Sequence, residues 1–321
     1  MVIAASLTGC GSDSAGGDTA SDSDSTAAPS STAASSRSTA ADETDVPYGP
    51  DTDCPADDPS CAGDQELDIY RSGRPGPNPV VIWVHGGAFA IGSKIDESEH
   101  FDDFLDKGWD LVSVDYRLTT ADGANAFPTA LSDVRRAVRW VKANADQHDW
   151  DPNRVAAIGH SAGGNLVGML AAAPDEADLD EPGLPTELAA HDPSVISAVA
   201  LTPVSDLATF ATVAEFTADV QRYAGCAQDT SSCPAAFERG SVQTHVDSSS
   251  APLLTFHGSD DPYAPPSQAE LVAAAYRSAG IGDRFEFVLV DDGPEKFRGH
   301  FPDIDRWAPK MVEFVEGASP R

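Results

Sequence analysis

Positive charge is scarce in this chain of 321 residues. Lys and Arg number 20 while Asp and Glu number 52, which gives a formal net charge of −32 at pH 7. Binding to nucleic acid or to an anionic membrane surface depends on basic side chains. The composition therefore argues against both kinds of partner, and we expect no nucleic acid to bind. The acidity favours solubility and does not identify a substrate.

Other signals are missing as well. No stretch approaches the roughly 18 apolar residues of a membrane span. Neither G-x-G-x-x-G nor a Walker pattern is present, which argues against a phosphate-binding loop. No C-x-x-C is present and no His lies close to a cysteine pair, so we expect no metal site. The hydrophobic content of 41% and charged content of 22% are typical of a soluble globular protein.

Four of the five cysteines fall into two pairs with the same spacing, Cys54 with Cys61 and Cys226 with Cys233. Four cysteines allow three connectivities, of which pairing within each short loop is the simplest. Disulfides form in oxidising compartments, so this pattern is consistent with an exported protein.

The fifth cysteine, Cys10, ends the sequence Leu-Thr-Gly-Cys, which resembles a bacterial lipobox. Residues 1–10 lack a positively charged start, so we interpret them as part of a lipoprotein signal. A chance match in a disordered leader is the alternative. Residues 11–66 begin with an almost unbroken series of Ser, Thr, Ala, Gly and Asp, and are predicted to be a disordered linker. We expect export, with the membrane reached only through a lipid on Cys10, or secretion.

The folded domain is expected at residues 67–321. Pro79–Val84 is a continuous apolar run, typical of a buried strand in a parallel sheet. The predicted strands are 67–71 (at an edge), 79–84, 109–115, 154–159, 198–201, 252–257 and 285–290, and the predicted helices are 96–107, 127–145, 162–173, 266–279 and 306–316. This alternation predicts an α/β fold with a doubly wound, mainly parallel sheet and helices on both faces. Ligands of such sheets bind at the carboxyl ends of strands.

Two segments interrupt the alternation. Residues 174–194 are rich in Asp, Glu and Pro and are predicted to cross the surface. Residues 206–250 form an insert or small cap with the aromatic residues Phe210, Phe216, Tyr223 and Phe237. We expect these aromatic side chains to form the insert's own small core, and a lid over the site is the alternative.

Ser161 is the candidate nucleophile. It lies in Gly159-His160-Ser161-Ala162-Gly163, between a short apolar run and an Ala/Leu/Met-rich segment. A G-x-S-x-G sequence between a strand and a helix places its serine at a strained turn that requires small neighbours. By itself the pattern also fits a turn that only connects two elements.

A serine nucleophile needs a base that a carboxylate orients, and in folds with this turn the chain order is Ser, acid, His. His300 is the candidate base because it follows the last predicted strand and precedes the last predicted helix. The other downstream histidines fit less well. His191 lies in the acidic segment, His245 lies in the insert, and His257 ends a strand, where we expect it to shape a turn.

The candidate acid follows the strand at 252–257, where Asp260 and Asp261 are adjacent. The pattern His-Gly-x-x-Asp favours Asp261, with Asp260 as the alternative and Asp206 as a third choice. The oxyanion of an acyl-transfer reaction also needs preset backbone N–H groups. We expect one from Ala162 and others from Gly87 and Ala88, with Gly86 making that turn possible.

These motifs together resemble the α/β-hydrolase superfamily. The segments that carry the likeness are HGGAF at 85–89, DYRL at 115–118, DPNR at 151–154, GHSAGG at 159–164, HGSDDPYAP at 257–265 and GHF at 299–301. Within the superfamily, the chain is similar to the esterases and lipases related to hormone-sensitive lipase and to feruloyl-esterase-like carboxylesterases. The resemblance implies a triad of Ser161, Asp261 and His300, and an oxyanion hole of Gly87, Ala88 and Ala162. Many relatives have Gly where this chain has Ala88.

The sequence thus predicts a carboxylic ester hydrolase that acts on a small-molecule ester through an acyl-enzyme and needs no cofactor. A serine peptidase of the prolyl-oligopeptidase type shares the fold and is one alternative. A non-catalytic cell-surface binding module is the other. The acyl and alcohol portions of the substrate stay open, because a fold does not identify a substrate.

Overall fold

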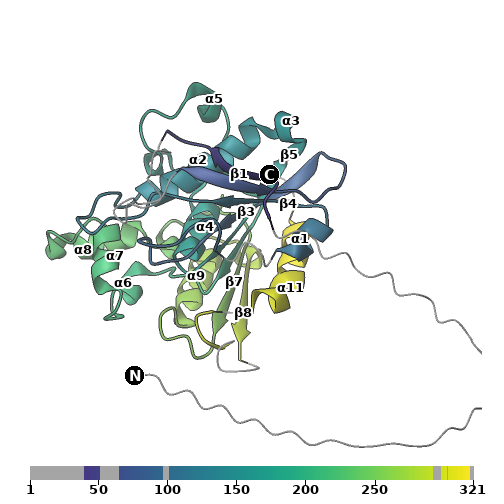
Figure 1. The fold of residues 1–321 in the computed structure, drawn as a ribbon. Coiled ribbons are helices and arrows are strands. Elements are labelled where there is room, and N and C mark those ends of the chain that lie inside the picture. Colours follow the sequence, from purple (N-terminus) through teal and green to yellow (C-terminus); the bar gives the residue numbers. More distant parts are fainter. Residues whose placement is uncertain (1–39, 51–64, 97–100, 292–297, 302, 319–321) are drawn as a thin grey trace, which may run out of the picture. The chain divides into compact units, whose positions relative to one another are not determined.

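The computed structural model describes residues 40–50, 65–96, 101–291, 298–301 and 303–318. Its strands are β1 (Glu43–Pro47), β2 (Glu66–Tyr70), β3 (Asn78–Val84), β4 (Asp110–Val114), β5 (Trp150–His160), β6 (Ala198–Leu201), β7 (Leu253–Gly258) and β8 (Phe285–Val290). They form one sheet in the order β1-β2-β4-β3-β5-β6-β7-β8 (Figure 1). β1 and β2 pair antiparallel with their neighbours, and the pairs from β4 to β8 are parallel.

Helices cover both faces of the sheet, as predicted. They are α1 (Asp102–Asp106), α2 (Thr129–Ala143), α3 (Ala145–His148), α4 (Ala162–Ala172), α5 (Thr186–Ala189), α6 (Leu207–Phe210), α7 (Thr217–Tyr223), α8 (Cys233–Arg239), α9 (Ser267–Ser278) and α11 (Ile304–Gly317). Single 3-10 turns occur at Ala177–Leu179, Thr230–Ser232, Val242–Thr244 and Gly282–Arg284.

β3 shows how its sequence gives two hydrophobic layers. All of its residues are buried, and successive side chains of a strand point to opposite faces. Val80, Ile82 and Val84 join a core cluster with α2, α4 and α9. Val81 and Trp83 join a second cluster with α1 and α11, which lie in contact with each other (Figure 1). A strand buried on both faces therefore has a continuous apolar sequence.

The amino-terminal edge of the sheet differs from the prediction. β1 lies inside the segment predicted to be a disordered linker, and it pairs with β2, so the strand predicted at an edge is the second in the sheet. The sequence of β1, Glu-Thr-Asp-Val-Pro, has no hydrophobic alternation because its side chains are exposed or half-buried. Backbone pairing, which composition does not reveal, holds this strand in place.

The insert at 206–250 also differs from the prediction. Phe210 and Tyr223 belong to the main core, and Phe216 and Phe237 pack against it, so the expectation of a separate small core is wrong. Tyr223 stacks on Phe89, with ring centroids 3.6 Å apart. The short helices α6, α7 and α8 of the insert lie together at one side of Figure 1. Cys226 and Cys233 form a disulfide within the insert.

Several predictions concern residues outside the described ranges. The lipidation of Cys10, the signal at 1–10 and the pairing of Cys54 with Cys61 belong to this group. Among the described residues, no helix combines the length and hydrophobicity needed to cross a membrane. The same residues hold no group of three His, Cys, Asp or Glu side chains suited to a metal ion.

Candidate active site

Ser161 lies at the turn between β5 and α4, with φ 54° and ψ −112°. A positive φ is uncommon for a residue with a side chain and stores backbone strain. Both flanking glycines are required there. A Cβ on Gly159 would lie 2.3 Å from the carbonyl oxygen of Gly163, and a Cβ on Gly163 would lie 2.1 Å from that of Val84. The close approach of strand and helix thus leaves no space for larger residues.

The three side chains predicted for a triad lie together at the carboxyl ends of strands. Ser161 Oγ is 2.8 Å from His300 Nε2, and His300 Nδ1 is 2.9 Å from Asp261 Oδ2. The side chains are buried, and the segments that carry them are far apart in the sequence. With its hydrogen on Nδ1, the His300 ring donates to the carboxylate and accepts from the serine hydroxyl.

The structure distinguishes the neighbouring Asp residues. Asp261 also accepts hydrogen bonds from the amides of Tyr263, at 2.8 Å, and Ala264, at 2.9 Å, so its carboxylate is fixed. Asp260 instead pairs with Arg298 at 2.9 Å, and its side chain is 49% exposed. Asp206, the third choice, caps α6 by accepting from the Thr209 amide, and its other carboxylate oxygen accepts from Gln243.

The other downstream histidines have structural partners. His257 Nδ1 donates to the carbonyl of Ala264 at 3.0 Å, so it shapes the turn that carries Asp261. Burial lowers the pKa of His257 to about 4, because a charged imidazole is poorly solvated there. His245 pairs with Glu176, and the carbonyl of His191 accepts from Arg139.

The turn after β3 has an unusual backbone. Gly87, Ala88 and Phe89 have φ of 114°, 51° and 64°. Among the described residues, the amides of Gly87 and Ala88 have no acceptor. The amide of Ala162 begins α4 and has no partner within its helix. A Cβ on Gly86 would lie 3.1 Å from the carbonyl oxygen of His160 and 3.3 Å from the Cβ of Ser161, so a larger residue would crowd the serine and glycine favours the close approach of this turn.

Contacts with neighbouring strands and loops hold the segment from residue 85 to residue 96 in place. Tyr116 Oη donates to the carbonyl of His85 at 3.1 Å, and the two rings stack with centroids 4.3 Å apart. Farther along, the amide of Lys94 donates to Asp115 Oδ1 at 2.6 Å. Lys94 Nζ contacts Asp115, Asp68 and, at 2.7 Å, Asp45 of β1. Burial alone would lower the pKa of Lys94, but these carboxylates raise it above its ordinary value.

The segment that carries His300 is held by two residues that the sequence did not single out. His160 Nε2 is 3.0 Å from the carbonyl oxygen of His300, and Thr202 Oγ1 donates to the same oxygen at 2.8 Å. A carbonyl only accepts, so His160 carries its hydrogen on Nε2. Thr202 has φ 41°, which is rare for a β-branched residue. The only sequence signals were a histidine beside Ser161 and a threonine after β6.

A cavity of about 590 Å³ opens beside Ser161 and His300. The 86–92 turn, which includes Ile91, lines one part of it, and large aromatic side chains line another, namely Phe210, Phe216, Tyr263 and Phe301. Its acidic lining residues are Asp96 and Asp219. Phe210 and Phe216 come from the insert, so the insert forms part of the cavity wall as well as part of the core.

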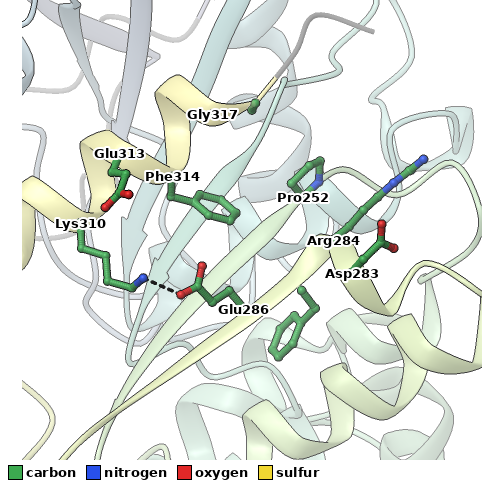
Figure 2. Close-up of a pocket in the computed structure, with 10 residues that line it drawn as sticks. Pro252, Asp283, Arg284, Glu286, Lys310, Glu313, Phe314 and Gly317 are labelled. Carbon is green, nitrogen blue, oxygen red and sulfur yellow. Dashed lines mark hydrogen bonds and ion pairs between the residues drawn. The ribbon is translucent and has the colours of Figure 1, made fainter.

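A second cavity, of about 400 Å³, lies between the start of β8 and α11 (Figure 2). Lys310 of α11 pairs there with Glu286 of β8, and Phe314 faces the same space. None of the predicted site residues lines this cavity. It begins at the amino end of β8, whereas His300 follows the carboxyl end, so it is not part of the Ser161 site.

The model of the BD-FAE family matches residues 67–276, which is more than half of the chain. The chain belongs to the BD-FAE family. Esterase LipQ of Mycobacterium tuberculosis is 28% identical over 246 residues, which cover 75% of this chain and 54% of LipQ. Esterase LipC of the same organism is 32% identical over 222 residues, which cover 66% of this chain and 51% of LipC. This family member thus spans about half the length of these relatives.

Solved structures support the same fold. A truncated carbohydrate esterase from gut microbiota superimposes with a TM-score of 0.68 at 22% identity, over 85% of this chain and 94% of the other. The thermophilic esterase Est2 of Thermogutta terrifontis superimposes with a TM-score of 0.63 at 21% identity, over 85% and 90% of the two chains. The fold is therefore that of the α/β-hydrolases, and the predicted fold and resemblance are confirmed.

Proposed function

We propose that this protein is a serine hydrolase of carboxylic esters that works through an acyl-enzyme. The observation that carries the proposal is the hydrogen-bonded series Ser161–His300–Asp261 beside a turn of unpaired amides. The relatives named as esterases support the same class of reaction. A buried serine hydroxyl in contact with an oriented imidazole is the arrangement that makes serine nucleophilic.

In the proposed reaction, Ser161 Oγ attacks the ester carbonyl carbon while His300 Nε2 takes the hydroxyl proton. The carbonyl oxygen becomes an oxyanion, which the amides of Gly87, Ala88 and Ala162 stabilise by hydrogen bonds. The C–O bond to the alcohol then breaks, and the alcohol leaves with the proton from His300. A water molecule then attacks the acyl carbon while His300 Nε2 takes its proton; the bond from this carbon to Ser161 Oγ breaks, and His300 returns the proton to Oγ, which releases the acid and free Ser161. Asp261 stabilises the imidazolium in both halves and fixes its tautomer.

Ser161→Ala is expected to abolish turnover of p-nitrophenyl butyrate and labelling by a fluorophosphonate. Labelling requires a nucleophilic serine, so a binding module that only shares the fold would give none in the wild-type chain. A panel of peptide amides tests the peptidase alternative. Turnover of the butyrate ester by Ser161→Ala at the wild-type rate would refute the proposal.

The adjacent aspartates provide a matched pair of variants. Asp261→Asn keeps the shape but removes the charge that faces the imidazole, and it is expected to lower kcat by roughly 10³- to 10⁴-fold. Asp260→Asn breaks only the half-exposed pair with Arg298, and its kcat should stay within about threefold of wild type. Equal losses in the two variants would contradict the role proposed for Asp261.

We also propose that the chain is exported and reaches a membrane only through a lipid on Cys10. The lipobox-like sequence at 7–10 supports this, and the Cys226–Cys233 disulfide fits an oxidising compartment. Mass spectrometry of the protein from a lipoprotein-processing bacterium should find a diacylglyceryl group on Cys10, and Cys10→Ser should move the protein from the membrane to the soluble fraction. An unmodified Cys10 in membrane-extracted protein would refute lipid anchoring.

A further inference from the structure

The cavity beside Ser161 combines an aromatic wall with negative charge. We propose that this site takes esters that are neutral or positively charged and discriminates against esters that carry a carboxylate, with Asp219 as the main determinant of that preference. The inference rests on the proposed ester hydrolysis and adds the charge class of the substrate.

The wall is continuous with the proposed base. Tyr263 meets the His300 ring edge to face with centroids 5.2 Å apart, and Phe216 meets Tyr263 in the same way at 5.1 Å. Phe210 stacks on Phe216 at 5.1 Å. Aromatic faces carry partial negative charge, so they bind apolar groups and cations better than anions. A substrate group next to His300 therefore meets ring surfaces first.

The charged residues of the lining have the same sign. Asp96 and Asp219 line the cavity, and no Lys or Arg among the described residues does so. Asp219 pairs with Arg222 one turn later on α7, but only Asp219 belongs to the lining. The cavity lining therefore includes the acidic member of this ion pair and not the basic one. The net charge of −32 adds a long-range repulsion of anions.

Three acetate esters of the same shape test the proposal. 4-Acetoxybenzoate, 4-acetoxybenzamide and 4-acetoxybenzamidine carry charges of −1, 0 and +1 on nearly isosteric phenols. We expect kcat/KM for the benzamide ester to exceed that for the benzoate ester by about tenfold or more at low salt. The benzamidine ester should be hydrolysed at least as well as the benzamide ester. In 1 M NaCl the preference should shrink to about threefold, because the screening length falls to about 3 Å.

The ion pair on α7 supplies two variants with opposite expected effects. Asp219→Asn removes the carboxylate and leaves the charge of Arg222, so the benzoate-to-benzamide ratio of kcat/KM should rise by about five- to tenfold. Arg222→Gln leaves Asp219 without its partner, so the same ratio should fall. The ratio is insensitive to a general loss of activity, which affects both esters alike.

Equal kcat/KM for the three esters in the wild-type protein would overturn the charge preference. A ratio that moves in the same direction in both variants would overturn the role of Asp219. If the wild-type protein hydrolyses the neutral ester no faster than buffer alone does, and if a fluorophosphonate does not label it, the proposed function itself is refuted. The two failures are therefore distinguishable.

Discussion

Thr202→Val tests whether the carbonyl of His300 must be held for catalysis. Valine keeps the branched shape of threonine and removes the hydroxyl that donates to this carbonyl at 2.8 Å. Thr202 is buried, and the carbonyl keeps the donor from His160, so no acceptor is left unpaired. A hydrogen bond of this kind contributes about 1 kcal/mol net to stability. If this whole loss is added to the activation free energy, because the imidazole is less well positioned, kcat should decrease roughly fivefold to tenfold.

His160→Phe completes a double-mutant cycle with Thr202→Val. The phenyl ring keeps the contacts that the imidazole makes with Phe301, at 5.4 Å between centroids, and removes the Nε2 donor. Each single variant leaves the His300 carbonyl one of the two donors, and the double variant leaves it neither. A buried polar group without a partner costs about 1–3 kcal/mol. The double variant should therefore lose more than the sum of the singles, in both kcat and the free energy of unfolding.

The assays for this cycle are the kcat and KM for p-nitrophenyl butyrate, urea unfolding, and the rate of fluorophosphonate labelling. A positioning role predicts a lower kcat and slower labelling, with little change in KM for Thr202→Val, since Thr202 does not line the cavity, whereas His160 does. Thr202→Ser retains the hydroxyl and should restore most of the rate. A wild-type kcat in Thr202→Val, or strictly additive losses in the double variant, would refute the reasoning.

Three further predictions concern stability. Burial lowers the pKa of His257 to about 4, so the unfolded chain, with a pKa near 6.5, binds the proton first as the pH falls. Stability should decrease by roughly 3 kcal/mol between about pH 6.5 and pH 4, and urea unfolding should find a smaller decrease in His257→Gln. Ala88 has a φ of 51°, which strains alanine but not glycine, so Ala88→Gly should raise the melting temperature or leave it unchanged. A lower melting temperature would contradict this, because it would mean that the backbone entropy lost by glycine outweighs any strain in Ala88. Replacing Cys226 and Cys233 by serine opens a loop with a sequence separation of 7 and should cost about 2.5 kcal/mol, measured by denaturation under oxidising conditions.

The sequence was most informative where a structural element can be built from only one kind of residue pattern. The continuous apolar run of β3 predicted a strand buried on both faces, and the apolar run before Ser161 predicted the strand–turn–helix at this residue. Strand ends that meet at one edge of a parallel sheet allowed Ser161, Asp261 and His300 to be expected together, and the structure brings them within hydrogen-bond distance. Chain order and sheet topology were sufficient for that expectation.

The sequence was least informative where exposed or ambiguous residues are ordered by distant partners. β1 has the composition of a linker, and its structure comes from its pairing with β2 and from contacts with distant residues, such as that between Asp45 and Lys94. Phe210 and Phe216 are apolar whether they form a core or line a cavity, so their sequence could not decide between the two. Thr202 belongs to no motif, and its contact with His300 spans 98 positions of the chain.

The edge position of β1 also bears on how this protein should be produced. A shortened chain that begins at residue 67, where the family match starts, would lack this strand. The outer backbone groups of β2 would then be open to pairing with another molecule, and Lys94 would lose its shortest ion contact. Such a chain should dimerise or aggregate through its sheet edge even though it retains Ser161, Asp261 and His300.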